Sequence, residues 1–362
     1  MLMKLVELLS WFAIPVGLLA ILDDWFLRPR RQIAAAPEPA HDPALLTFAY
    51  RVLPILIGAA VLRLLVAERL DFSAVLLLIT VITGVVWGLD VLLLRRSRDA
   101  AARAAGKEPA VATEPATVDY ARSFFPVALV VLLLRSFIFE PFRIPSDSMM
   151  PTLLDGDFII VNKYAYGLRL PVLNTKFVPI GEPQRGDVVV FRYPLDPSIN
   201  YIKRLVGLPG DKVQVKDDRI FVNGEPIPFE VTGPYNDGCY VNMLQARERI
   251  GEHTHTALFC PTPLDMTPSP LPTCNRKQVR GYRCGDRQYL GGDYAEPPTP
   301  IQEVPPGMYL MIGDNRDNSE DGRVWGFVPE NHLVGKATRI WFNWDLQRSG
   351  GPVWSRIGSR IE

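Results

Sequence analysis

The sequence predicts a mainly β domain with a curled or barrel-like sheet, preceded by transmembrane α-helices. Nearly all long apolar runs of the 362-residue chain lie before Phe142. After Pro145, short runs rich in β-branched and aromatic residues alternate with Gly, Pro, Asn and Asp, a pattern typical of strands and turns. Helical periodicity is scarce in this second part. We therefore expect a membrane region at residues 1–142 and one β-rich domain at 143–362.

Four apolar runs are candidate membrane spans, since a span needs about 20 mainly apolar residues. The third run is the clearest because Asp90 is its only charge. Charged groups within a membrane usually find partners, so Arg63 and Asp90 are expected to pair across the hairpin 53–94. The four runs are residues 2–22, 53–67, 72–94 and 124–139.

Arginine-rich segments follow the first and third runs and predict the orientation. Such segments are retained in the cytoplasm, so both ends of the chain and the domain 143–362 are expected on the periplasmic or exterior side. Residues 34–43 and 98–115 are rich in Ala and Pro and predict flexible cytoplasmic linkers. A cleaved signal peptide is the alternative for the first run, but no small-x-small site precedes Asp23 and Asp24.

The strands of the domain are expected where β-rich runs lie between turn formers. Asn223-Gly224 is a strong signal for a tight turn between two of them. Residues 233–300, rich in Pro, Gly, Thr and Cys, show little periodicity and are expected to form an inserted subregion. The expected strands are 158–162, 187–193, 202–206, 212–216, 219–222, 308–312 and 336–344.

All four cysteines lie in the domain proposed to be exterior, which predicts two disulfides in an oxidising compartment. Three pairings are possible. Zinc binding is the competing interpretation, but no Cys-x-x-Cys pair exists. His253-x-His255 is weak evidence for a metal and is expected in solvated polar sequence. We expect neither a metal nor a cofactor. The cysteines are Cys239, Cys260, Cys274 and Cys284.

The charge balance argues against nucleic acid as a partner. The chain has 39 basic and 39 acidic residues and a formal net charge of zero. Proteins that bind nucleic acid generally need a basic surface to neutralise phosphates.

Three segments predict a hydrolytic site made from serine and lysine. They are 144–157 (IPSDSMMPTLLDGD), 201–211 (YIKRLVGLPGD) and 313–326 (GDNRDNSEDGRVWG). A serine hydroxyl is a poor nucleophile until a base takes its proton. Lysine can be that base only when neutral, and burial favours its neutral form. Lys203 stands in an apolar stretch. The alternative is that Lys203 faces solvent and that Ser146 and Ser148 are turn residues.

The three segments, in this order, resemble the signature boxes of bacterial type I signal peptidases (leader peptidases), a family of Ser-Lys endopeptidases. Residues 185–191 (RGDVVVF) resemble a further strand of that family. The resemblance implies the family's curled β-sheet fold, Ser148 as nucleophile and Lys203 as general base. It also implies that Ser146 helps to hold the oxyanion and that Ser319 orients the lysine. Asp321 and Arg323 match a structural ion pair, and Asp314 to Asp317 are expected to be mostly turn scaffolding.

The chain departs from the family pattern in three places. Asp147 stands where the family usually has Gly, Gly322 stands where it has Ser, and four apolar runs replace about two. Alternate side chains of an extended segment face opposite ways. Asp147 is therefore expected to face away from the site, toward solvent or a basic partner.

The resemblance implies a membrane-bound serine endopeptidase that removes signal peptides from exported preproteins at the bacterial cytoplasmic membrane. The expected partners are these preproteins and the phospholipid bilayer. Two alternatives stay open, namely another Ser-Lys hydrolase of the self-cleaving regulator type and a non-catalytic, membrane-anchored β-domain. The oligomeric state cannot be predicted.

Overall fold

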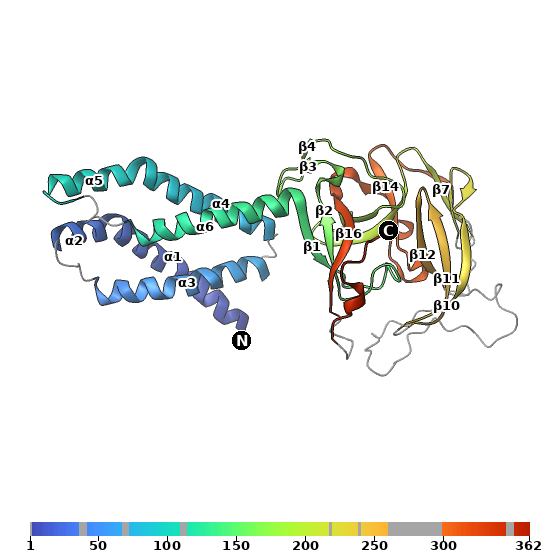
Figure 1. Ribbon diagram of the computed structural model, residues 1–362, viewed down its shortest axis with the longest axis horizontal. Helices are drawn as coiled ribbons and strands as arrows, with labels where there is room; N and C mark the ends of the chain where they lie inside the picture. Colours follow the sequence, from blue (N-terminus) through green and yellow to red (C-terminus); the bar gives the residue numbers. More distant parts are fainter. Residues whose placement is uncertain are drawn as a thin grey trace. The chain divides into compact units, whose positions relative to one another are not determined.

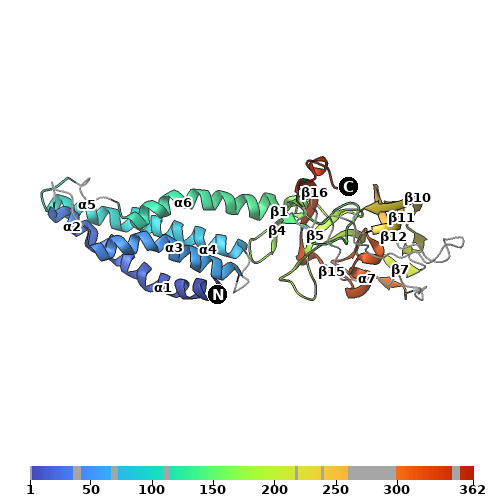
Figure 2. The same ribbon diagram turned by 90° about the horizontal axis from the view of Figure 1, so that it is seen from below.

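The chain divides into two compact units, Met1–Ser136 and Phe137–Glu362, each described here by itself (Figures 1 and 2). The computed structural model describes residues 2–35, 42–66, 72–108, 114–216, 219–237, 240–259, 299–344 and 351–362. The division lies a few residues before the boundary expected at 142, because strand β1 (Phe139–Arg143) already belongs to the second unit.

The first unit is helical. Within it α1 packs against α3, and α4 packs against α6. Four stretches of its described residues are long and apolar enough to cross a membrane: Lys4–Ala35, Ala44–Arg63, Phe72–Ala104 and Ala116–Ile138. The helices are α1 (Leu2–Leu22), α2 (Arg28–Ala35), α3 (Ala44–Val66), α4 (Phe72–Leu89), α5 (Arg95–Ala104) and α6 (Ala116–Leu133).

Part of the linker expected at 98–115 is helical, because α5 continues to Ala104. Alanine and arginine are both strong helix formers, so their abundance here favours helix over coil. The predicted pair of Arg63 and Asp90 is also wrong. Asp90 pairs with Arg98, eight residues further along the same helical stretch. Arg63 instead donates to Ser10 Oγ at 3.1 Å. A partner on the same stretch was available to Asp90 without crossing the hairpin.

Asp24 caps a helix that begins far away in the sequence. Its carboxylate accepts hydrogen bonds from the backbone N–H groups of Ala116 at 3.0 Å and Thr117 at 2.7 Å. The Asp24 side chain is fully buried and lies 3.2 Å from Arg28. The first N–H groups of a helix have no partner inside the helix. Asp24, near the end of the first helical stretch, therefore accepts hydrogen bonds from N–H groups at the start of α6 that have no partner within the helix.

The second unit confirms the predicted fold class. Its main sheet has seven antiparallel strands in the order β1-β2-β16-β5-β6-β14-β15. Strand β16 carries register shifts against both neighbours, and such bulges bend a strand and increase its twist. The sheet is therefore curled. The strands after β1 are β2 (Asp157–Asn162), β5 (Val188–Arg192), β6 (Asn200–Gly207), β14 (Met308–Ile312), β15 (Val328–Pro329) and β16 (Leu333–Asn343).

Apolar side chains fill both faces of this sheet. Ile159, Val161 and Val190 are buried on one face, and Val189, Phe191 and Leu205 on the other. Because neighbouring residues of β5 are buried on opposite sides, its sequence is a continuous apolar run.

Three smaller sheets accompany the main one in the described residues, and two of them are short. Asn223 (φ 55°) and Gly224 (φ 87°) form the predicted tight turn, in which both residues have positive φ. The four-stranded sheet contains β7 (Lys212–Lys216), β8 (Arg219–Val222), β9 (Glu225–Pro226) and β13 (Gln302–Glu303). A short hairpin contains β3 (Leu168–Arg169) and β4 (Lys176–Val178).

The expected inserted subregion is more regular than its composition predicted. Strands β10 (Phe229–Asp237), β11 (Tyr240–Ile250) and β12 (His253–Phe259) form an antiparallel sheet. A register shift between Val231 and Gly233, followed by Pro234, interrupts the alternation and hides the strand from pattern recognition. Residues 260–298 and all four cysteines lie outside the described residues, so the two disulfides stay a prediction.

Candidate active site

Ser148 lies in the loop between β1 and β2. The backbone N–H of Ile144 donates to Asp157 O at 2.7 Å, which closes the base of this loop. Within the loop the side chains of Ile144, Met149 and Leu153 are almost fully buried in the core. Ser148 is itself only 8% exposed. Apolar neighbours on both sides thus anchor the serine at one defined place beside the sheet.

Lys203 meets Ser148 from the middle of β6, paired with Val189 of β5. Its Nζ lies 2.5 Å from Ser148 Oγ, within hydrogen-bonding distance. The lysine is 4% exposed, and its Nζ lies 5.5 Å from the centre of the Tyr201 ring. The interpretation that Lys203 faces solvent is therefore excluded.

Burial lowers the pKa of Lys203 from about 10.5 to about 8, because the ammonium ion loses its hydration. The charges of Asp321 and Asp314 act in the opposite direction and only partly offset this effect. At pH 7 about one lysine in ten is then neutral. A neutral amine can accept the proton of the serine hydroxyl.

Asp321 and Asp314, the two carboxylates that most raise the pKa of Lys203, are each bound to an arginine. Arg204 binds Asp314 through two hydrogen bonds of 2.8 and 2.7 Å. Arg323 Nε donates to Asp321 Oδ1 at 2.9 Å, as expected for this ion pair. Burial alone would raise the pKa of both carboxyl groups, but the arginines outweigh it and hold each pKa below its ordinary value.

The segment that begins at Asp314 is more than turn scaffolding. Asp314 is fully buried, and Arg316 is 3% exposed and binds Glu248 of β11. His255, expected in solvated sequence, is 6% exposed on β12, with Nε2 3.2 Å from Glu248 Oε2 and 3.6 Å from Asp314 Oδ1. These groups come from segments far apart in the chain, so composition alone indicated turns. Across the described ranges, no group of three or more His, Cys, Asp or Glu side chains is arranged to hold a metal ion.

Two residues that sequence reasoning missed hold the serine loop in place. Asn315 donates from Nδ2 to Asp147 O at 3.0 Å and from its backbone N–H to Ser148 O at 3.1 Å. Gly313 leaves room for close contact, because a Cβ there would lie 2.6 Å from Ser148 O and 2.1 Å from Ser319 Oγ. The signal was present in the Gly-Asp-Asn run, which was interpreted only as a turn.

Ser146 and Ser319 both lie beside the reacting pair. Ser146 is exposed, and its Oγ lies 3.5 Å from Ser148 Oγ. Ser319 Oγ is buried, and the Ser319 hydroxyl is one of the groups that lower the pKa of the Asp321 carboxyl. No hydrogen bond from Lys203 to Ser319 is seen in this part of the chain, so the orienting role of Ser319 stays a prediction.

Asp147 contacts a tyrosine of the β10–β12 sheet. Its carboxylate is half-buried and accepts a hydrogen bond of 2.9 Å from the hydroxyl of Tyr240, on β11. Asn318 Nδ2 donates to the same hydroxyl. Tyr240 is 5% exposed and packs with Met150, beside the serine loop. The tyrosine lies 93 residues away in the sequence and was not foreseen, and the expected basic partner stays a prediction.

Comparisons with known proteins agree on one family. Residues 117–342 match the family model described as signal peptidase, peptidase S26. Signal peptidase I of Pseudomonas aeruginosa is 42% identical over 311 residues, covering 80% of this chain and 98% of the relative. Signal peptidase I of Haemophilus influenzae is 33% identical over 335 residues, covering 79% and 90%. A solved structure of a signal peptidase I from Enterococcus faecalis aligns with a TM-score of 0.22 and 24% identity, covering 43% of this chain and 97% of that one.

Replacing Asp147 by Gly should change the rate of hydrolysis by less than about tenfold, equivalent to roughly 1.4 kcal/mol of barrier. The carboxylate is held on Tyr240, so its removal takes no charge from the Ser148–Lys203 pair. The measurement is kcat/KM with a peptide substrate. A change of a hundredfold in either direction would show that Asp147 belongs to the reacting groups.

Proposed function

This chain belongs to the signal peptidase family, peptidase S26, and from that premise we propose that it removes signal peptides from exported preproteins with Ser148 as nucleophile and Lys203 as general base. The observation that carries the proposal is the 2.5 Å contact between Ser148 Oγ and a buried lysine whose pKa is about 8. The chain is thus a serine endopeptidase of this family. No histidine is needed for proton transfer in this pair.

The first chemical step is attack by Ser148 on the carbonyl carbon at the cleavage point. Neutral Lys203 takes the hydroxyl proton as the new C–O bond forms. The carbonyl oxygen then becomes negatively charged and needs hydrogen-bond donors. The Ser148 N–H has no acceptor within the described residues, and the Ser146 hydroxyl lies close by. These two groups are the proposed oxyanion donors.

Collapse of the tetrahedral intermediate completes acylation. The lysine ammonium gives its proton to the departing amine, and an ester to Ser148 remains. Lys203, neutral again, takes a proton from water, which attacks the ester. As the C–O bond to Ser148 breaks, the lysine ammonium returns this proton to Ser148 Oγ and the signal peptide is released. Ser319, whose hydroxyl is buried, is the proposed acceptor that orients the amino group while Ser148 is acylated. Asn315 keeps the serine backbone in place throughout.

The alternatives are weaker on this geometry. A non-catalytic β-domain has no use for a buried lysine that has no carboxylate partner among the described residues, because its desolvation costs stability. A self-cleaving regulator would not need four helices long and apolar enough to cross a membrane. Cleavage of a purified exported precursor in detergent separates the three possibilities.

The protein is anchored in a membrane. We propose that it crosses the bacterial cytoplasmic membrane several times, with both arginine-rich segments in the cytoplasm and the second unit in the periplasm. Support comes from the arginines of α2 and α5, which lie at the ends of two of the candidate spans.

Replacing Ser148 by Ala should abolish precursor cleavage and leave thermal unfolding unchanged, because it removes the nucleophile but little volume. Ser146→Ala should keep weak activity, since one oxyanion donor is typically worth about 10²–10³ in rate. Gel assays of precursor cleavage measure both. Full activity of Ser148→Ala would sink the mechanism.

The cleavage rate should rise with pH through about 8 and then level off, because only neutral Lys203 acts as base. Below that pKa the rate should fall about tenfold per pH unit. Lys203→Arg should be inactive at every pH, since a guanidinium group stays protonated. The measurement is kcat/KM from pH 6 to 10. A rate that does not change over this range would contradict lysine as base.

Protease added to intact spheroplasts should digest exposed loops of the second unit and spare residues 98–115. Antibodies against an epitope in each region report which is cut, and permeabilised cells serve as the control in which both are accessible. The reverse pattern in intact spheroplasts would overturn the proposed orientation.

A further inference from the structure

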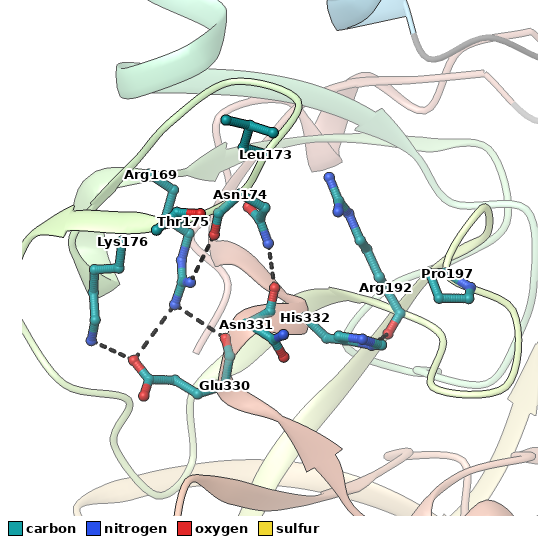
Figure 3. A pocket seen from close by; sticks show the side chains of 10 residues that line it. All are labelled: Arg169, Leu173, Asn174, Thr175, Lys176, Arg192, Pro197, Glu330, Asn331 and His332. Atoms are coloured by element: carbon teal, nitrogen blue, oxygen red, sulfur yellow. Dashed lines mark hydrogen bonds and ion pairs between the residues drawn. The ribbon is translucent and has the colours of Figure 1, made fainter.

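A polar cleft of about 370 Å³ opens beside the β3–β4 hairpin, outside the active site described above (Figure 3). Arg169, Lys176 and Arg192 contribute three permanent positive charges to its wall, and Glu330 is its only acid. The cleft is therefore suited to an anion.

Arg192 differs from the other two cations of the cleft in having no side-chain partner among the described residues. Arg169 donates to Glu330 O at 3.1 Å, and Lys176 forms an ion pair with the Glu330 carboxylate. The side chain of Arg192 makes no hydrogen bond or ion pair with any residue in the described ranges. Figure 3 shows it extending toward the hairpin tip near Leu173, apart from Glu330. A free guanidinium next to two anchored cations is a good donor for phosphate oxygens.

The tip of this hairpin presents apolar side chains to solvent. Leu173 is 73% exposed, Val172 43% and Leu170 40%. Val172 has φ 68°, a conformation that β-branched residues rarely adopt. Strained backbone of this kind is found where the surrounding structure imposes a particular presentation. Apolar residues next to cations are typical of surfaces that lie in a membrane interface.

A ring contact joins the hairpin to the first residue of the second unit. Phe177 of β4 packs edge-on against Phe137, with ring centres 6.0 Å apart. Phe137 belongs to the same compact unit as the hairpin and is also one of the last residues of the apolar stretch Ala116–Ile138. The hairpin therefore contacts the residues at which this apolar stretch ends.

We propose that this cleft binds the phosphate of an anionic phospholipid, with Arg192 as the main ligand and the Leu170–Val172–Leu173 tip in the interfacial layer. The negative charge of the head group matches the excess of cations, and the acyl chains continue toward the apolar tip. This site concerns lipid binding and does not depend on the Ser148–Lys203 mechanism.

The test is a titration of the full-length, delipidated protein in mild detergent with phosphatidylglycerol, followed by native mass spectrometry. Arg192→Gln should weaken binding by about fivefold or more, the effect typical of one cation near an anionic lipid surface. Leu173→Asp should weaken it as well. Arg249→Gln, at an exposed arginine of β11, is the matched control and should bind like the wild type. Precursor cleavage in detergent should be unchanged in Arg192→Gln and Arg249→Gln, which shows that both variants are folded.

Competition with inorganic phosphate distinguishes a phospholipid head group from free phosphate as the ligand of the cleft. Millimolar phosphate should not displace the lipid, because it lacks the apolar part that the hairpin tip contacts. Displacement by phosphate, together with unchanged binding in Leu173→Asp, would assign the cleft to free phosphate and overturn the lipid proposal. Unchanged lipid binding in Arg192→Gln, or an equal loss in Arg249→Gln, would show that the cleft is not the site.

Discussion

The desolvation of one amino group is the constraint on which the rest of the active site depends. Lys203 is buried without a carboxylate bound to it, and each unit by which its pKa falls corresponds to about 1.4 kcal/mol. A carboxylate that paired with the lysine would stabilise the ammonium form, raise its pKa and leave almost no neutral amine near pH 7. Asp314 and Asp321 lie near enough to do this electrostatically, yet Arg204 and Arg323 engage them. The two ion pairs thus preserve a neutral lysine.

The β10–β12 sheet contacts the segment that contains Asp314 and Arg316. Glu248 and His255 of that sheet bind or face Arg316 and Asp314, and the Leu258 N–H donates to Asp314 O at 2.8 Å. Tyr240 binds the carboxylate of Asp147, the residue before Ser148. A region that looked like a surface insertion is therefore a wall of the active site. Changes in this sheet should act on the chemistry through the position of the serine loop.

Local sequence predicted the fold class and singled out Ser148 and Lys203, which the structure brings into contact, because their signals are local. Runs such as Val188–Arg192 predict buried strands directly, and the two motifs around Ser148 and Lys203 are contiguous. The pairings that build the surroundings join segments 50 to 170 residues apart and leave no local pattern. Asp147 with Tyr240 and Asp314 with Arg204 are examples, separated by 93 and 110 residues. The strands of the insertion were missed because a bulge and Pro234 hide their alternation.

The ribosome makes Asp24 long before it makes the start of α6, which Asp24 caps. The acceptor is made 93 residues before the Thr117 N–H that it binds. At about 5–20 residues per second, the carboxylate waits roughly 5 to 20 seconds for its partner to leave the ribosome. Arg28, one helical turn away, neutralises it in the meantime. The acceptor for the first N–H groups of α6 is therefore already present on the first helical stretch when α6 emerges from the ribosome.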